Sequence, residues 1–125
     1  VCLMHPAESP YAHLLGIKLI DRHDGYARLQ MQVKEEHLNS LGTAHGGLIF
    51  SLGDTAFALC CNYGGKVAVA IDISVQYMAP AVEGDVLVAE AREIKRTRSL
   101  SFCRVEVRNR DRLIAVLQST SFIKG

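Results

Sequence analysis

The residues from Asn39 to Gly65 limit the possible folds more than any other part of the sequence. A glycine-rich segment ending in Gly46 and Gly47 runs into about five turns of mostly apolar residues, at 3.6 residues per turn. Apolar side chains occupy every face of this predicted helix, a pattern typical of a buried helix. The rest of the chain is strand-like, so we expect a fold built around one long helix.

Asp54 is the one charge in the predicted helix. An ionised carboxylate that is buried without a partner costs several kcal/mol. A mid-helix Asp can instead face solvent or bond locally to Ser51 or Thr55. Phe50 and Phe57 lie about one turn away on the same face, which predicts that this face is covered. A carboxylate in a covered apolar cleft is a candidate acid, base or nucleophile.

The glycines at the start of the helix predict an oxyanion site. Gly46 and Gly47 leave the first helix N–H groups unobstructed, and these groups with the helix dipole favour negative charge on a bound oxygen. Gly46 and Asp54 are eight residues apart, which separates their backbones by roughly 12 Å along one helix. One small reacting group cannot touch both. A site that uses both therefore requires a second copy of the chain with its helix antiparallel to the first.

Three short runs of residues carry a resemblance to a known family. They are His37-Leu38-Asn39, Gly42-Thr43-Ala44-His45-Gly46-Gly47, and Phe50 with Leu52-Gly53-Asp54-Thr55-Ala56. Together they resemble the signature of hotdog-fold acyl-CoA thioesterases, in particular the PaaI-like, phenylacetate-pathway branch, and the similarity extends from about residue 11 to residue 123. The resemblance implies a hotdog fold, one antiparallel sheet wrapped around the long helix. It also implies active sites at a homodimer interface, with the dimers paired into a homotetramer.

The resemblance implies chemical roles for four of these residues. Asp54 is the catalytic carboxylate, acting either as a general base on water or as a nucleophile that forms a mixed anhydride. Gly46 supplies the N–H that polarises the thioester carbonyl. Asn39 supplies a side-chain amide near the water or the carbonyl, unless it only shapes the loop. His45 either transfers a proton or, as we expect, hydrogen-bonds the loop and fixes the glycines.

A basic turn and a proline loop are the expected contacts for coenzyme A. Residues 95–99 form the one local basic cluster, which by itself is typical of a solvated hairpin tip. The resemblance implies that the CoA phosphates bind there, and arginine suits paired contacts with phosphate oxygens. We therefore expect Arg96, Arg98 and Ser99 to bind CoA, and Pro80 to border the pantetheine channel.

Phe50, Thr55 and Phe57 are candidates to line the acyl pocket, although core packing is the commoner role for each. No metal or cofactor is expected, because a thioester is already activated and the histidines show no ligand spacing with cysteines or acids. Coenzyme A is part of the substrate. The four cysteines lack C-x-x-C spacing and are expected to be reduced core residues: Cys2, Cys60, Cys61 and Cys103.

The periodicity of the remaining chain predicts an α+β fold with an antiparallel sheet, because helices and strands do not alternate. A short helix follows the cap signal Ser9-Pro10, and residues 34–37 are expected to form a solvated turn. Strands are predicted at residues 17–20, 26–33, 67–77, 85–95, 100–109 and 112–123. The strand at 67–77 is expected in the sheet centre or at a dimer edge. At 125 residues we expect one domain, with residues 1–8 as a loose arm.

Charge and hydropathy limit the kinds of partner that we expect this protein to bind. A net charge of +1 with a pI near 7.9 argues against a nucleic-acid-binding protein. No apolar run reaches the roughly 18 residues of a membrane span, and no signal-peptide pattern is present, so we expect a cytoplasmic protein.

These features predict an acyl-CoA thioesterase that hydrolyses an aryl- or acyl-CoA to the free acid and coenzyme A. The alternative is a non-catalytic acyl-CoA binding or sensor module of the same fold, which needs only the basic turn and the tunnel. A hotdog dehydratase or hydratase is a second alternative. Its histidine and acid occur in motifs that this sequence does not show.

Overall fold

The computed structural model describes residues 9–124, so the arm predicted at residues 1–8 lies outside the described part. The elements in chain order are α1 (Pro10–Leu15), β1 (Lys18–His23), β2 (Tyr26–Gln32), the 3-10 helix η2 (Glu35–His37), α2 (Gly46–Cys61), β3 (Val67–Tyr77), β4 (Val86–Arg96), β5 (Leu100–Asn109) and β6 (Arg112–Lys124). The predicted succession of a short helix, two strands, a long helix and four strands is confirmed.

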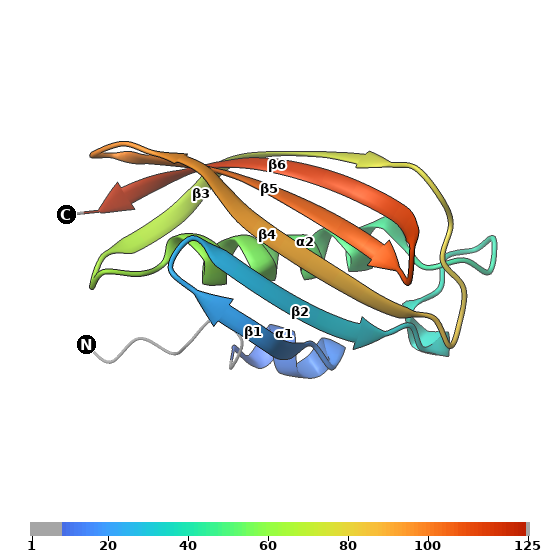
Figure 1. Ribbon diagram of the computed structural model, residues 1–125. Helices are drawn as coiled ribbons and strands as arrows, with labels where there is room; N and C mark the ends of the chain where they lie inside the picture. The colour runs from blue at the N-terminus through green and yellow to red at the C-terminus, as the bar shows by residue number, and fades with distance from the viewer. Residues whose placement is uncertain (1–8, 125) are drawn as a thin grey trace.

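The strands form one antiparallel sheet in the order β1-β2-β4-β5-β6-β3 (Figure 1). β3 pairs with β6 from Val67 opposite Lys124 to Tyr77 opposite Ala115. Of the two positions expected for this strand, the structure shows the edge. The antiparallel α+β prediction is confirmed.

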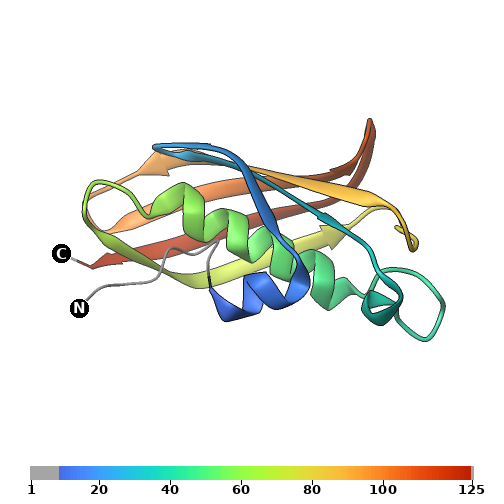
Figure 2. The same ribbon diagram turned by 90° about the horizontal axis from the view of Figure 1, so that it is seen from below.

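The long helix α2 lies against one face of the curved sheet, and α1 lies beside α2 (Figure 2). Four fully buried side chains, one from each of the strands β2, β4, β5 and β6, form the sheet side of the core: Leu29, Leu87, Val105 and Leu117. Leu52, Phe57 and Leu59 form the helix side. Each such side chain stabilises the fold by about 2 kcal/mol through removal from water.

Gly53 allows α2 to approach the sheet closely. A Cβ at this position would lie 2.6 Å from the Leu117 Cδ2, well inside normal contact. A larger residue at this crossing of α2 over β6 would therefore require the buried Leu117 side chain to shift.

The single chain buries the helix on all but one face, as expected where one sheet covers a helix. Asp54 is exposed, and Phe50, Thr55 and Ala58 are only partly buried. The neighbouring edge strand also carries exposed apolar side chains, among them Ile71 at 62%. A single sheet covers only one side of a helix, so this face is open in the isolated chain, and covering by a second copy stays a prediction.

The predicted cap of the short first helix and the predicted turn before α2 differ in how well they agree with the structure. The cap of α1 is confirmed, because the Ser9 Oγ accepts from the Ala12 N–H at 3.1 Å and Gly16 ends the helix with φ of +76°. The solvated turn at residues 34–37 is only partly right. Its last residue, His37, is buried, and its Nδ1 accepts from the Lys34 N–H at 3.0 Å.

Candidate active site

The loop before α2 is shaped by the side chain of Asn39. Its Oδ1 accepts from the N–H groups of Leu41 at 2.9 Å and Thr43 at 3.1 Å, and its Nδ2 donates to the Thr43 Oγ1 at 2.9 Å. The loop-shaping role considered for Asn39 is therefore what the isolated chain shows. One hydrogen of its Nδ2 remains for another acceptor, because an amide nitrogen carries two.

His45 is the N-cap of α2. Its Nδ1 accepts from the Gly47 N–H at 2.8 Å, and its own N–H donates to the His37 carbonyl at 2.9 Å. An Nδ1 that accepts a hydrogen bond belongs to the neutral ring with its proton on Nε2. This hydrogen bond is the one expected if His45 fixes the glycines, and the role itself stays a prediction.

Among the described residues, the Gly46 N–H is the group in the first turn of α2 that has no hydrogen-bond acceptor. Gly47 donates to the His45 ring, while Leu48 and Ile49 both donate to the His45 carbonyl, at 3.0 and 3.4 Å. Among residues 9–124, no acceptor is found for the Gly46 N–H. An unpaired N–H at a helix N-terminus, where the dipole is positive, is suited to an oxygen that gains negative charge.

An open cleft of about 440 Å³ lies at this end of α2. Three predicted site residues meet in its wall: Asn39, Gly46 and Pro80. The other lining residues are Thr43, Ala44, Ile49, Tyr77, Met78 and Ala79. Tyr77 was not predicted. Its hydroxyl donates to the Gly46 carbonyl at 2.8 Å. The two residues are 31 positions apart, so local sequence patterns do not predict this contact.

Asp54 lies two turns further along α2 and does not line this cleft. Its side chain is exposed on the open face of the helix, yet the surrounding chain removes enough water to raise the pKa of its carboxyl above the ordinary range. The structure thus keeps the two catalytic candidates apart within one chain, as their spacing predicts.

The three residues proposed for the acyl pocket lie outside the cleft. Phe57 is 1% exposed and packs in the core, so its assignment to the pocket is corrected to a core role. Thr55 donates from Oγ1 to the Ser51 carbonyl at 2.8 Å on its own helix. Phe50 is partly buried and packs against the core from the open face.

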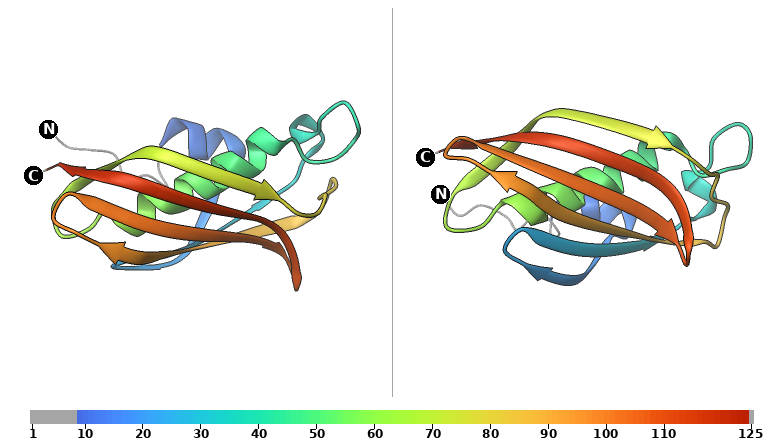
Figure 3. Two further views of the ribbon diagram at one scale, coloured as in Figure 1. Left: turned by 90° about the horizontal axis from the view of Figure 1, so that it is seen from above. Right: turned by 45° about the horizontal axis from the view of Figure 1, so that its top comes forward.

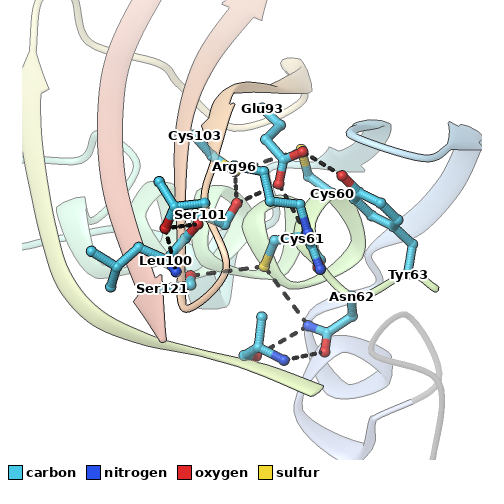
Figure 4. Close-up of polar contacts among 12 residues, drawn as sticks. Cys60, Cys61, Asn62, Tyr63, Glu93, Arg96, Leu100, Ser101, Cys103 and Ser121 are labelled. Carbon is cyan, nitrogen blue, oxygen red and sulfur yellow. Dashed lines mark hydrogen bonds and ion pairs between the residues drawn. The ribbon is translucent and has the colours of Figure 1, made fainter. Parts of the chain in front are cut away.

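Arg96 is turned inward, which corrects its assignment to CoA. One guanidinium nitrogen donates to the Glu93 Oε2 at 3.0 Å and to the Cys61 carbonyl at 3.1 Å (Figure 4). The guanidinium also lies over the Tyr63 ring, 4.1 Å from its centre, and the side chain is only 21% exposed. Arg96 therefore caps the C-terminal end of α2, where a cation is favoured by the dipole.

Arg98 and Ser99 are exposed in the turn between β4 and β5. This turn lies at the opposite end of the molecule from the amino end of α2 (Figures 1 and 3). Pro80 lies with the cleft at that amino end. Within one chain, the expected CoA contacts are therefore split between the two ends.

Buried polar groups surround the carboxyl end of α2 (Figure 4). The Glu93 carboxylate accepts from the hydroxyls of Tyr63 and Ser101 as well as from Arg96. Burial, together with this carboxylate, raises the pKa of Tyr63 to about 12. These bonds satisfy the Glu93 carboxylate within the fold.

Three of the four cysteines are free and buried, as predicted: Cys60, Cys61 and Cys103. Cys2 lies outside the described residues. The sulfur atoms of Cys60 and Cys103 are 3.8 Å apart. Residues 9–124 contain no group of three or more His, Cys, Asp or Glu side chains placed to hold a metal, and none of their helices is long and apolar enough to cross a membrane.

An antiparallel sheet wrapped around one long helix defines a hotdog-fold protein. Residues 41–116 match the thioesterase superfamily. A putative esterase of Archaeoglobus fulgidus is 44% identical over 110 residues, which cover 87% of this chain and 71% of that protein. Human acyl-coenzyme A thioesterase 13 is 36% identical over 103 residues, covering 80% and 74%.

Solved structures agree with these sequence matches. The PaaI protein from the phenylacetic acid degradation operon of Escherichia coli superposes with a TM-score of 0.91 at 33% identity, covering 94% of this chain and 86% of that one. A Streptococcus mutans protein bound to acetyl-CoA superposes with a TM-score of 0.84 at 28% identity, covering 87% and 89%. The chain belongs to the thioesterase superfamily, in its PaaI-like branch, and is an enzyme of the thioester hydrolase class.

Proposed function

We propose that this thioesterase hydrolyses an acyl- or arylacyl-CoA to the free acid and coenzyme A, at sites shared between two copies of the chain. The observation that carries the proposal is that Gly46 lines the cleft and that its N–H has no acceptor among the described residues. A thioester carbonyl oxygen in the cleft would accept from this N–H. The bond would strengthen as the oxygen becomes an anion.

Asp54 from a second copy supplies the other half of the site. Along one helix it is roughly 12 Å from Gly46, too far to serve the same carbonyl. If the exposed β3 edges and the open faces of α2 meet in an antiparallel pair, each Asp54 approaches the amino end of the other helix. The ionised carboxylate then either removes a proton from a water that attacks the carbonyl carbon, or attacks that carbon itself. On either route the C–S bond breaks and CoA leaves as the thiolate, which takes up a proton derived from water. On the second route a water then hydrolyses the acyl–Asp54 anhydride, which releases the free acid and restores the carboxylate.

Asn39 and His45 act on the loop and the helix start. The second Nδ2 hydrogen of Asn39 can donate to the attacking water, while its other bonds keep the loop in shape. His45 holds Gly47 in place and carries no proton-transfer step here. Phe50 and Thr55 would line the acyl group only where a second copy closes over the open helix face.

For coenzyme A, the Streptococcus mutans relative offers a bound acetyl-CoA as precedent. We expect Arg98 and Ser99 to contact the phosphates, with Arg96 holding the base of the same turn. In an antiparallel dimer the partner's basic turn comes to the amino end of α2, beside Pro80. The two expected CoA contacts, separated in one chain, would then flank one site. The pairing of such dimers into a tetramer, the absence of any cofactor and a cytoplasmic location remain predictions.

The experiment that tests the function is thiol release from a panel of aryl- and straight-chain acyl-CoA thioesters. Asp54→Asn should lower turnover by at least about a hundredfold, the scale of losing a positioned base. Asp111→Asn, at an exposed acid in the β5–β6 turn, is the matched control and should leave turnover unchanged. Near-normal release by Asp54→Asn would remove this carboxylate from the mechanism.

The same panel separates the alternatives. A sensor module would retain CoA tightly and release no thiol from any substrate. A hydratase would add water to an enoyl-CoA without releasing thiol. Release of thiol that depends on Asp54 contradicts both.

A further inference from the structure

Tyr77, the last residue of β3, lies against the start of α2. The carboxyl end of β3 and the amino end of α2 occupy the same end of the molecule (Figures 1 and 3). The Tyr77 hydroxyl donates to the Gly46 carbonyl at 2.8 Å. The contact is close, because a Cβ on Gly46 would lie 3.1 Å from both the Cζ and the hydroxyl oxygen of Tyr77.

The peptide group between Gly46 and Gly47 is held at both of its polar ends. Tyr77 binds its carbonyl oxygen at 2.8 Å, and the His45 Nδ1 binds its N–H at 2.8 Å. The neighbouring peptide carries the Gly46 N–H, which has no acceptor among residues 9–124, and Gly46 itself lines the cleft. The orientation of that N–H depends on the backbone angles of Gly46, and these are restrained by the peptide that follows.

Two consecutive glycines have no side chains to restrict their backbone. At such a site external hydrogen bonds must hold the geometry that side chains would otherwise impose. The backbone before the turn is held where the His45 N–H donates to the His37 carbonyl at 2.9 Å. Tyr77 reaches the turn from the sheet and binds the Gly46 carbonyl itself.

The Tyr77 hydroxyl is suited to this task. Partial burial raises the pKa of Tyr77, so the hydroxyl keeps its proton and donates throughout the neutral and mildly alkaline range. Half of the side chain remains exposed, and its ring lines the cleft beside Gly46. Tyr77 therefore lies beside the position proposed for the thioester carbonyl, but its hydroxyl takes no part in the bonds that form or break.

We propose that Tyr77 is a positioning residue, which aims the Gly46 N–H at the thioester oxygen by holding the Gly46 carbonyl from β3. This inference rests on the proposed function, in which the Gly46 N–H stabilises the developing oxyanion. Tyr77 acts through Gly46 and contacts no reacting atom. Its contribution appears when negative charge develops, so it affects turnover more than substrate binding.

The test compares Tyr77→Phe with Tyr26→Phe. Tyr26 is a matched control, because its hydroxyl also donates one hydrogen bond, to the Glu90 Oε2 at 2.6 Å, and neither Tyr26 nor Glu90 lines the cleft. We expect Tyr77→Phe to lower kcat about tenfold with KM changed less than about twofold, and Tyr26→Phe to leave both unchanged. Melting temperatures are measured for both. Unchanged kcat in Tyr77→Phe would overturn the proposal.

A double variant separates this inference from the proposed function. Gly46→Pro removes the open N–H altogether, so adding Tyr77→Phe to it should cause no further loss of kcat. A further tenfold loss would show that Tyr77 acts elsewhere and would overturn its positioning role. If Gly46→Pro alone keeps full turnover, the proposed oxyanion donor itself is wrong.

Discussion

The two ends of α2 differ in how completely their backbone groups are bonded. At the carboxyl end, Arg96 binds the Cys61 carbonyl and Arg22 binds the Leu59 carbonyl, while the Asn62 side chain binds that of Ala58. At the amino end, three of the first N–H groups are bonded and that of Gly46 is not. A helix leaves unsatisfied groups at both ends unless something caps them. The more fully bonded carboxyl end serves stability, and the amino end, with its unbonded N–H, is where a ligand oxygen can bind.

Replacement of Gly46 gives the largest expected effect, because it removes the open group itself. Proline is tolerated in the first turn of a helix, and the extended backbone of His45 suits the residue before a proline. We expect Gly46→Pro to lower kcat by about 100- to 1000-fold, the scale of losing one oxyanion donor.

Gly46→Ala is the matched control for this change. It places the same Cβ near Tyr77 but keeps the N–H, so it measures the steric cost alone. Thiol release by both variants separates the two effects. Equal activity of the proline and alanine variants would mean that the N–H has no catalytic part.

At the carboxyl end of α2, loss of Arg96 should lower stability and leave catalysis nearly unchanged. Arg96→Met leaves Glu93 without its cation and the Cys61 carbonyl without its donor, which should cost about 1–3 kcal/mol of unfolding free energy. Arg92→Met removes an exposed pair with Glu90 and should cost well under about 1 kcal/mol. Urea unfolding of both variants measures these two losses of unfolding free energy. A large rise in KM for acyl-CoA with no loss of stability would return Arg96 to the CoA site.

Arg98 is expected to behave in the opposite way to Arg96. Its side chain is exposed, and the CoA phosphates that it is expected to bind are far from the thioester bond that breaks. Arg98→Ala should therefore raise KM several-fold and change kcat little. Unfolding in urea should be unchanged. A loss of kcat at constant KM would refute the phosphate contact.

The smallest expected effect is on the pH dependence of stability at Asp54. Its folded-state pKa is raised by desolvation, so the neutral form is favoured in the folded chain, and ionisation at neutral pH costs stability. Asp54→Asn should therefore raise the melting temperature slightly at pH 7. The gain should disappear below the ordinary Asp pKa of about 3.9, where the wild-type carboxyl is protonated in both states. A gain that persists at acidic pH would point to packing instead of charge.

Much of the fold follows from local patterns in the sequence. The strands β3 and β5 begin and end at the predicted residues, because turn glycines and polar turns bound alternating or apolar runs on both sides. α2 starts at the predicted glycine. The role of His45 as a cap and the loop-shaping bonds of Asn39 were also foreseen as alternatives, since both depend on neighbours within four residues.

The errors concern contacts between residues far apart in sequence. Arg96 was expected to face phosphate because its turn is basic, but Glu93, Cys61 and Tyr63 surround it. Tyr77 was missed because its partner Gly46 lies on another element. Which face of α2 the sheet covers could not be predicted either, since apolar residues occur on all sides of that helix.

The measurement that tests the central claim most directly is complementation between Asp54→Asn and Gly46→Pro chains, unfolded together and refolded as a mixture. Each variant alone should be nearly inactive. In a mixed dimer, one site combines the intact Gly46 of one chain with the intact Asp54 of the other, so the mixture should regain about a quarter of wild-type thiol release. A mixture that stays as inactive as its components, although mixed dimers form, would contradict a site shared between two copies.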